Sequence, residues 1–333
     1  MNTLTQATKV TLLLCGILGN DNSVKPLSNA EYRKILQVVQ TTGIEFERLL
    51  SFEELSTISE HANIDTNRLE NLLSRGVKLG FAVEEWQRNG IWIISQSDEE
   101  YPKYYKKHLA DRYPPIIFGI GDVSLLNSGG IAVVGSRTID EHAKNFTREF
   151  AKLCSFNQIT VVSGGARGVD QIIMEDTIKS EGSVVGVLAD NLLKKSLEST
   201  VRIALNDGNL VLISPFNPKA GFRIGTAMAR NKLIYGLSDY AVVVNADYKK
   251  GGTWAGAVEE IKRDNSIPVF VRYDENVPKG NKKLVEVGAI PLSQKIEGKN
   301  LLNSLKNLAG NKSPANKPYN LTLFSFNEDK KDA

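Results

Sequence analysis

The sequence predicts an α/β protein in which a doubly wound, mainly parallel sheet follows a small N-terminal helical domain. Short apolar runs recur between residues 91 and 271, helical segments separate them, and the residues before 91 are amphipathic without a glycine-rich loop. A continuous apolar run is typical of a strand buried on both faces, and strand–helix–strand repeats wind such strands into a parallel sheet. The length of 333 residues accommodates both parts.

Residues 1–95 are expected to form the helical domain. The apolar segment 10–18 predicts a first core helix, because it is shorter than the roughly 20 residues that cross a bilayer and lacks a signal-peptide cleavage site. Ser28 and Glu31 have the spacing of a helix capping box, and Gly43 is expected to end that helix. Further short amphipathic helices are expected at 52–58 and 69–79.

Residues 96–300 are expected to form the α/β domain. The predicted strands are 91–94, 131–134, 159–162, 184–188, 210–213, 241–244 and 268–271. The predicted helices are 140–155, 169–180, 197–206, 225–237 and 253–263. A last short helix is predicted at 301–310, in a C-terminal tail of residues 301–333 whose segment 321–326 is strand-like. Ligands of such sheets bind at the carboxyl ends of the strands, so a site is expected in the turns that follow them.

The charge balance limits the possible functions. The chain has 41 Lys and Arg against 38 Asp and Glu, a formal charge of +3, so any phosphate site has to be a local cluster. Cys15 and Cys154 have no metal-ligand spacing and fit core positions in a reducing cytoplasm. His61, His108 and His142 lie away from the turns after the strands and are expected at the surface. We therefore expect no metal, no cofactor, no acid–base machinery and no membrane segment.

The turn after the first strand of the parallel sheet reads Gly135-Ser136-Arg137-Thr138. Glycine lets backbone amides approach a phosphate, the hydroxyls and the planar guanidinium can bind its oxygens, and the next helix begins there. A tight turn with a surface arginine explains the same residues equally well.

A second glycine-rich turn follows residues 159–162. It contains Ser163, Gly164, Gly165, Arg167 and Gly168. The turn matches neither the G-x-G-x-x-G fingerprint nor a Walker A loop, so ATP hydrolysis is not expected. The glycines alone are compatible with tight packing, but two such turns on neighbouring strands form one concave surface that favours a phosphate site.

Two cations flank an aromatic ring in the loop after residues 210–213. These residues are Lys219, Phe222 and Arg223. Cations that follow phosphates and a ring that stacks on a base suit a single strand of nucleic acid, and stacking contributes about 1–3 kcal/mol per base. A solvated loop with one packed phenylalanine is the alternative.

Arg230, Asn231 and Lys232 are expected to open a helix that runs on through residues 233–238. A basic and polar helix start suits an anion. Arg230 can also pair with a carboxylate and fix the helix, and the two interpretations are compatible.

The third glycine-rich turn is Gly251-Gly252-Thr253, and the helix that follows contains Glu259 and Glu260. Three such turns at one edge of a sheet favour an anion site over packing alone.

In these motifs the chain resembles the DNA-processing protein A family, also called DprA or Smf. The resemblance runs from about residue 97 to residue 292 and is carried by motifs in the family's order. The motifs include Tyr101-Pro102, Val133-Val134-Gly135-Ser136-Arg137, Ser163 to Asp170, Ser214-Pro215-Phe216, Arg230 to Ser238, Gly251-Gly252-Thr253 and Gly280-Asn281. The N-terminal helices are similar in size and place to the family's sterile-alpha-motif-like domain.

The resemblance implies an extended Rossmann-like domain that binds single-stranded DNA and helps to load the RecA recombinase in natural transformation and recombination. It also implies a cytoplasmic homodimer that needs no catalysis. The residues that would line the DNA site, carried over by motif, are Gly135, Ser136, Arg137, the 163–168 loop, Lys219, Phe222 and 230–232.

The chain departs from the family pattern in places. Ile173-Met174 stand where the family has Ala-His, and Ala227-Met228-Ala229 stand where Phe-Pro is usual. Two other functions stay open. Gly251-Gly252-Thr253 with Glu259 loosely resembles the Pro-Gly-Gly-x-Gly-Thr-x-x-Glu turn of cytokinin-activating phosphoribohydrolases, which implies a nucleotide sensor or enzyme. The third function is a scaffold that recruits partners through its helical domain and tail.

Overall fold

The computed structural model describes residues 4–19, 24–52, 54–292 and 300–310, and these contain one nine-stranded sheet. Its order is β1-β2-β6-β5-β4-β3-β7-β8-β9. The strands are β1 (Trp92–Ser95), β2 (Ile116–Gly121), β3 (Ile131–Val134), β4 (Val161–Ser163), β5 (Val184–Val187), β6 (Leu210–Ser214), β7 (Tyr240–Val243), β8 (Val269–Arg272) and β9 (Ile290–Leu292). Seven strands, β3 to β9, form its parallel part.

The parallel part of the sheet is doubly wound, as the sequence predicts. From β3 the chain moves outward through β4, β5 and β6, then returns to place β7 on the other side of β3, where Ala132 pairs with Ala241. The order of the strands therefore reverses between β3 and β7, and this switch point is where ligands of such folds bind. The hairpin of β1 and β2 extends the sheet, because β2 runs antiparallel to both β1 and β6.

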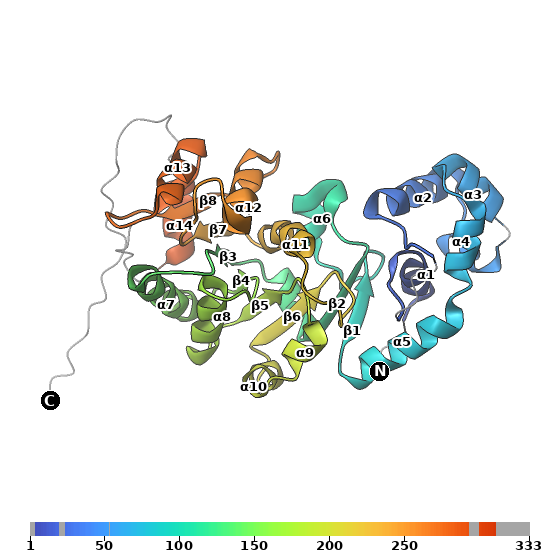
Figure 1. Ribbon diagram of the computed structural model, residues 1–333, viewed down its shortest axis with the longest axis horizontal. Helices are drawn as coiled ribbons and strands as arrows, with labels where there is room; N and C mark the ends of the chain where they lie inside the picture. The colour runs from blue at the N-terminus through green and yellow to red at the C-terminus, as the bar shows by residue number, and fades with distance from the viewer. Residues whose placement is uncertain (1–3, 20–23, 53, 293–299, 311–333) are drawn as a thin grey trace.

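Helices cover both faces of the sheet, as Figure 1 shows. One layer contains α6 (Lys103–Leu109), α11 (Ile224–Gly236), α12 (Gly251–Lys262) and α13 (Lys279–Val287). The other contains α7 (Glu141–Phe156), α8 (Val169–Lys179), α9 (Leu192–Ser196), α10 (Ser199–Asn206) and α14 (Leu301–Gly310). Side chains alternate along each strand, so Val133 packs in the α7 layer and its neighbours Ala132 and Val134 pack in the α11 layer.

The N-terminal helices surround α1, whose Leu12, Leu13 and Leu14 are buried. The expected first core helix is thus present, although it ends at Cys15 and Ile17 is exposed. The helices are α1 (Gln6–Cys15), α2 (Asn29–Thr42), α3 (Leu55–Ala62), α4 (Thr66–Leu73) and α5 (Gly76–Arg88), with a 3-10 turn, η1 (Phe46–Ser51). The capping box predicted at the start of α2 is present, and Gly43 ends α2 with a φ of 71°.

The N-terminal helices and the sheet share one core. The Trp86 ring on α5 meets the Phe118 ring on β2 edge to face, with centroids 4.9 Å apart. The Thr8 hydroxyl on α1 donates to the Asp98 carboxylate at 2.6 Å. Apolar residues of both parts accordingly belong to a single buried cluster.

Several expected elements differ in detail from the structure. The helix predicted at 69–79 is divided between α4 and α5. The one predicted at 197–206 is α10, which begins two residues later, at Ser199, and the short helix α9 before it was not expected. Strands β2 and β9 are not among the predicted strands. Helix α12 begins at Gly251, so the third glycine-rich turn is the first turn of a helix. The strand-like segment 321–326 lies outside the described residues.

Two predictions about titratable residues have clear outcomes. His108 was expected at the surface, and this is wrong: it is buried on α6, where its Nδ1 lies 3.2 Å from the Gly236 carbonyl oxygen. His61 and His142 are exposed, and Cys154 is buried, as expected. In the described ranges no helix combines the length and apolar character needed to cross a membrane.

Candidate nucleic-acid interface

The turns after β3 and β7 meet at the switch point of the sheet. The Ser136 N–H donates to both the backbone oxygen and the side-chain Oδ1 of Asn245, each at 3.1 Å. The Gly135 backbone also lies against α8, because a Cβ at this position would come within 2.4 Å of a Val169 methyl group. The hydrogen bonds from Ser136 to Asn245 therefore hold the two turns together. The Ser136 N–H already has partners within the protein.

The end of β4 and the turn after it pack tightly against β3 and the turn that follows it. The buried Ser163 hydroxyl donates to the Val133 carbonyl at 2.7 Å. Gly168 has a φ of 93°, and a Cβ there would lie 2.4 Å from the Ser136 carbonyl oxygen. A side chain is excluded both by this contact and by the left-handed backbone, so Gly168 is required for the shape of the turn.

A buried arginine and a buried aspartate lie beneath these turns. Arg230 is 5% exposed and Asp170 is 6% exposed. Arg230 Nη1 donates to the Val187 carbonyl at 2.9 Å, and its Nε has no partner among the described residues. A Cβ on Gly164 would overlap the Arg230 guanidinium, so this glycine makes room for the charge.

Burial raises the pKa of the Asp170 carboxyl to about 6, although the charge of Arg230 and the backbone N–H groups of Gly135, Ala166 and Gly164 oppose this rise. Burial likewise lowers the pKa of Arg230, against the charge of Asp170. Each charge thus reduces the cost of burying the other. We call Ser163, Gly164, Gly168, Asp170 and Arg230 the floor of the interface.

Above the floor, exposed side chains from three turns form what we call the rim. The rim consists of Arg137, Thr138, Arg167, Lys219 and Phe222. The Arg137 guanidinium lies 5.1 Å from the centroid of the Phe222 ring, which is 49% exposed. Arg137 follows β3 and Phe222 follows β6, so the fold brings together two residues that are far apart in the sequence.

The loop after β6 also touches the N-terminal helices. The Lys219 ammonium forms an ion pair with the Glu85 carboxylate on α5. In the same loop, Asn217 Nδ2 donates to the Ile17 carbonyl at 2.8 Å, just after α1. One cation of the rim is therefore already in contact with a carboxylate of the helical part.

The remaining predicted residues join α11 to α12. Residues 230–232 were expected to open a helix, and this is wrong, because α11 begins at Ile224 and places them in its middle. Asn231 Nδ2 donates to the Gly252 carbonyl at 3.1 Å. Burial lowers the pKa of Lys232, and the nearby Arg112 lowers it further while Glu259 raises it.

The structure thus distributes the predicted site residues among three levels of burial. Ser163, Gly164 and Arg230 are buried. The partly buried residues are Gly135, Ser136, Gly165, Gly168, Asn231, Lys232, Gly252 and Thr253. The exposed residues are Arg137, Thr138, Arg167, Lys219, Phe222 and Gly251.

Asp170 and Asn245 are part of this arrangement, although sequence reasoning did not select them as site residues. Asp170 lies in the first turn of the helix that follows a glycine-rich turn, and Asn245 lies just after an apolar strand. A polar residue at the carboxyl end of a buried strand is a signal that would have found Asn245.

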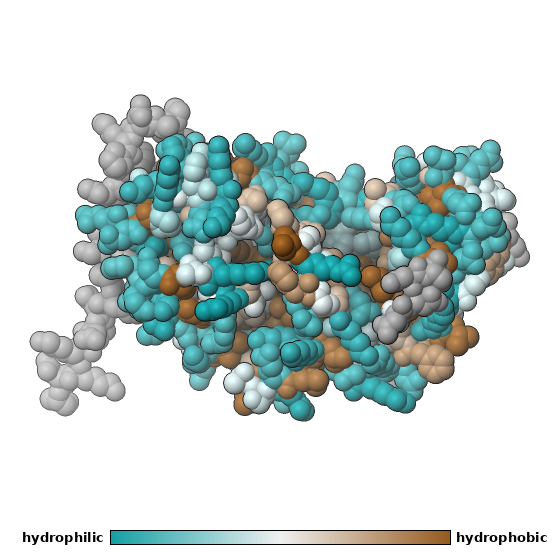
Figure 2. Space-filling view, in the orientation of Figure 1, coloured by the Kyte–Doolittle hydropathy of each residue, from teal (hydrophilic) through white to brown (hydrophobic). Residues whose placement is uncertain are grey.

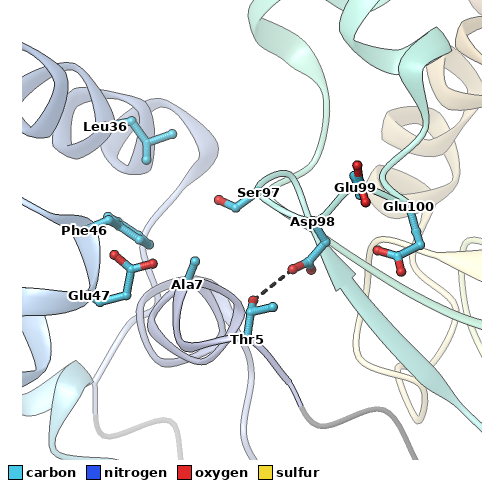
Figure 3. A pocket seen from close by; sticks show the side chains of 9 residues that line it. All are labelled: Thr5, Ala7, Leu36, Phe46, Glu47, Ser97, Asp98, Glu99 and Glu100. Carbon is cyan, nitrogen blue, oxygen red and sulfur yellow. Dashed lines mark hydrogen bonds between the residues drawn. The ribbon is translucent and has the colours of Figure 1, made fainter.

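An acidic hollow elsewhere on the molecule does not suit a polyanion. A hollow of about 600 Å³ lies between α1, α2, η1 and the turn after β1, and Glu47, Asp98, Glu99 and Glu100 line it (Figure 3). Thr5 donates a hydrogen bond across its base to Asp98 at 2.9 Å. These carboxylates repel a phosphate group, so the rim at the carboxyl edge is a better candidate for a phosphate site than this hollow.

In the part of the chain that the structure describes, no group of three His, Cys, Asp or Glu side chains has the arrangement of a metal site. Figure 2 shows that hydrophilic side chains cover most of the visible face, with apolar side chains in separate small patches.

The family model described as DNA recombination-mediator protein A matches residues 92–304. The chain belongs to this family. The membership that the motifs predicted is thereby confirmed, and the matched residues span all nine strands and the whole carboxyl edge.

Individual relatives agree with the family model. The DNA processing protein DprA of Bacillus subtilis is 28% identical over 221 residues, which cover 64% of this chain and 71% of that protein. The protein Smf of Synechocystis is 26% identical over 233 residues, which cover 63% of this chain and 57% of that protein.

Solved structures of the family share the fold. The X-ray structure of DprA from Streptococcus pneumoniae superposes with a TM-score of 0.68 at 19% identity, covering 87% of this chain and 95% of that one. A Helicobacter pylori DprA, described for its single-stranded DNA binding mode, gives a TM-score of 0.52 at 24% identity, covering 66% and 96%. The predicted α/β class with N-terminal helices is confirmed.

The two departures from the family pattern differ in burial. Ile173 and Met174 on α8 are buried in the core between that helix and the sheet. Met228 on α11 is 51% exposed and two residues from Arg230.

Proposed function

We propose that this protein binds single-stranded DNA along the carboxyl edge of its sheet and acts without catalysing a reaction. The observation that carries the proposal is the contact between Arg137 and Phe222. Two loops that follow separate strands place an exposed ring beside a planar cation, at the switch point of a doubly wound sheet.

A ring and a cation at one site select a particular form of nucleic acid. Bases are free to stack on a side chain in a single strand and are hidden in a duplex, whereas the guanidinium can bind a phosphate of either. The whole chain carries a formal charge of only +3, so binding has to depend on this local cluster. Strong preference for a single strand and strong sensitivity to salt follow.

We further propose that the protein loads a recombinase of the RecA type on the bound strand and works as a cytoplasmic homodimer. Family membership supports these proposals. A dimer would bring two rims to one strand, and the second contact would then be intramolecular, which raises the overall affinity.

Fluorescence anisotropy with labelled oligo-dT, against a duplex of the same length, tests the DNA proposal. We expect tight binding of the single strand at low salt, weaker binding of the duplex, and at least about a tenfold loss of affinity in Arg137→Ala, equivalent to about 1.4 kcal/mol. Lys152→Gln, an exposed cation on α7, is the matched control and should bind like the unmodified chain.

Failure of the unmodified chain to bind any DNA at low salt would reject the proposal. Release of a free base from a nucleoside monophosphate, abolished by Glu259→Ala, would instead assign the phosphoribohydrolase-like alternative. In the structure the Glu259 carboxylate faces Arg112 Nη1 at 3.4 Å.

A further inference from the structure

An aromatic cluster with several cations follows β7. Tyr248 and Trp254 meet edge to face, with ring centroids 5.0 Å apart and an interplanar angle of 84°. The ammonium groups of Lys249 and Lys279 lie 5.3 and 5.4 Å from the Tyr248 centroid. Tyr248 is 36% exposed, so its ring is open to solvent between these groups.

The cluster is held firmly at the same edge of the sheet as the rim. Asn245, three residues before Tyr248, accepts the hydrogen bonds from Ser136, the residue before Arg137. On the other side the Asn281 side chain accepts from the Ala246 N–H at 2.8 Å and donates to the Val244 carbonyl at 2.9 Å. The loop that carries Tyr248 is therefore joined to the turn that carries Arg137, at the carboxyl ends of β7 and β3.

The start of α13 is pressed against this loop. A Cβ on Gly280 would lie 1.9 Å from the Ala246 carbonyl oxygen and 2.9 Å from the Tyr248 amide nitrogen. Only glycine permits this approach, and the approach brings Lys279 over the tyrosine ring.

The local charge is positive. Lys249, Lys250 and Lys279 are exposed, and within the described ranges none of them forms an ion pair. Asp247 is also exposed and offsets one of these charges. An exposed contact between a cation and a ring is worth only about 0.5–1 kcal/mol, so either ammonium can leave the ring for a phosphate at small cost.

We propose that Tyr248 is a second base-stacking subsite for single-stranded DNA, with Lys249 and Lys279 binding the flanking phosphates. The inference rests on the proposed function of the rim and extends it. A strand that stacks on Phe222 would cross the switch point between β3 and β7 and stack again on Tyr248, whose edge is supported by Trp254.

The dependence of affinity on oligonucleotide length tests this path. We expect Tyr248→Ala to lower the affinity for a long oligo-dT about 5- to 100-fold, the range that loss of one stacked base produces. The loss should shrink towards none as the oligonucleotide is shortened until it reaches only the rim. Tyr248→Phe, which keeps the ring, should bind within about twofold of the unmodified chain at every length.

The lysines have a separate readout. Each phosphate contact contributes about 0.7 to the slope of log affinity against log salt on a single strand, so Lys249→Gln with Lys279→Gln should lower the slope by about 1.4.

Phe156→Ala is the matched aromatic control for Tyr248→Ala. Phe156 is 67% exposed at the far end of α7, where the chain turns back to the amino edge of the sheet.

The outcomes separate the two proposals. If the unmodified chain binds no single strand, the proposed function fails. If it binds and Tyr248→Ala equals it at every length, only the second subsite is rejected. A third outcome is that dTMP alone binds and Tyr248→Ala removes this binding, while the effect of Tyr248→Ala on oligo-dT does not depend on oligonucleotide length. That outcome overturns the strand path in favour of a mononucleotide subsite.

Discussion

The floor and the rim of the interface use the same kinds of residue for opposite purposes. Both contain an arginine, but Arg230 is 5% exposed and hydrogen-bonded to a strand carbonyl, whereas Arg137 is exposed beside Phe222. Both arginines lie at the carboxyl edge of one sheet, Arg137 in the turn after β3 and Arg230 on α11 against the end of β5. A glycine, serine and arginine motif therefore does not reveal by itself which member binds a ligand and which member shapes the turn.

The largest expected effect comes from breaking the floor. Gly168→Ala should destabilise the protein by about 3 kcal/mol or more, because the left-handed backbone and the contact with the Ser136 carbonyl both oppose a Cβ. Urea unfolding followed by circular dichroism measures this. Gly221→Ala is the control, since nothing lies within 4 Å of a Cβ there, and it should change the free energy of unfolding by less than about 0.5 kcal/mol. Equal losses in both variants would contradict the distinction.

A pH experiment tests the buried charge of the floor. The pKa of Asp170 is raised from 3.8 to about 6, so the folded state binds its proton more tightly than the unfolded state does. Stability from this group is complete below pH 4 and is lost as the pH rises through about 6. At about 1.4 kcal/mol for each pKa unit the loss is about 3 kcal/mol.

Asp170→Asn removes this titration. The difference in unfolding free energy between the unmodified chain and Asp170→Asn, measured by urea unfolding at pH 4 and pH 7, should therefore move by about 2 kcal/mol in favour of the variant at the higher pH. A difference that is independent of pH would show that Asp170 titrates normally in the folded state.

Removing the ring of the rim should change binding and leave stability alone. Phe222→Ala should weaken the binding of oligo-dT about 5- to 100-fold, through the loss of one stacked base. Because Phe222 is half exposed, the unfolding free energy should change by less than about 0.5 kcal/mol. A variant that loses stability and retains affinity would place Phe222 with the floor.

The smallest expected effect concerns the ion pair between the rim and the helical part. Glu85→Gln frees Lys219 for a phosphate and should raise the affinity for oligo-dT by up to about fivefold, since exposed ion pairs contribute about 0.2–1 kcal/mol. The matched control is Glu84→Gln, which breaks the neighbouring pair with Arg88 on the same helix. Lower affinity in Glu85→Gln would mean that the contact positions Lys219 for DNA instead of occupying it.

Most of the sheet could be predicted from the sequence because its strands are buried on both faces. Runs such as 131–134 and 241–244 are entirely apolar for this reason. The two-residue-period signal is absent from such runs, so the ends of the strands shift by a residue or two, and the expected 159–162 becomes Val161–Ser163. Strand β9 contains a proline and only three residues, too little for any pattern.

The site was harder to predict because exposure depends on tertiary packing. Arg230, Leu233, Ile234 and Leu237 recur at the spacing of one helix face, and this pattern already places Arg230 with core residues. In contrast, no local signal shows that the Ser163 hydroxyl donates its hydrogen bond to the Val133 carbonyl, since the two residues are 30 positions apart in the sequence. The same holds for Lys219 and Glu85, which belong to different parts of the chain.

The edge-to-face contact of Trp86 with Phe118 has a consequence for how shortened versions of this protein behave. Deleting the first 90 residues would bare Phe118, Ile116 and Ile93, which now lie within one continuous core. Such a fragment would expose a hydrophobic surface beside the β1–β2 hairpin at the edge of the sheet and would tend to self-associate. Lost activity in that fragment would then report on aggregation, so point changes on the intact chain are the sounder way to assign a role to the helices.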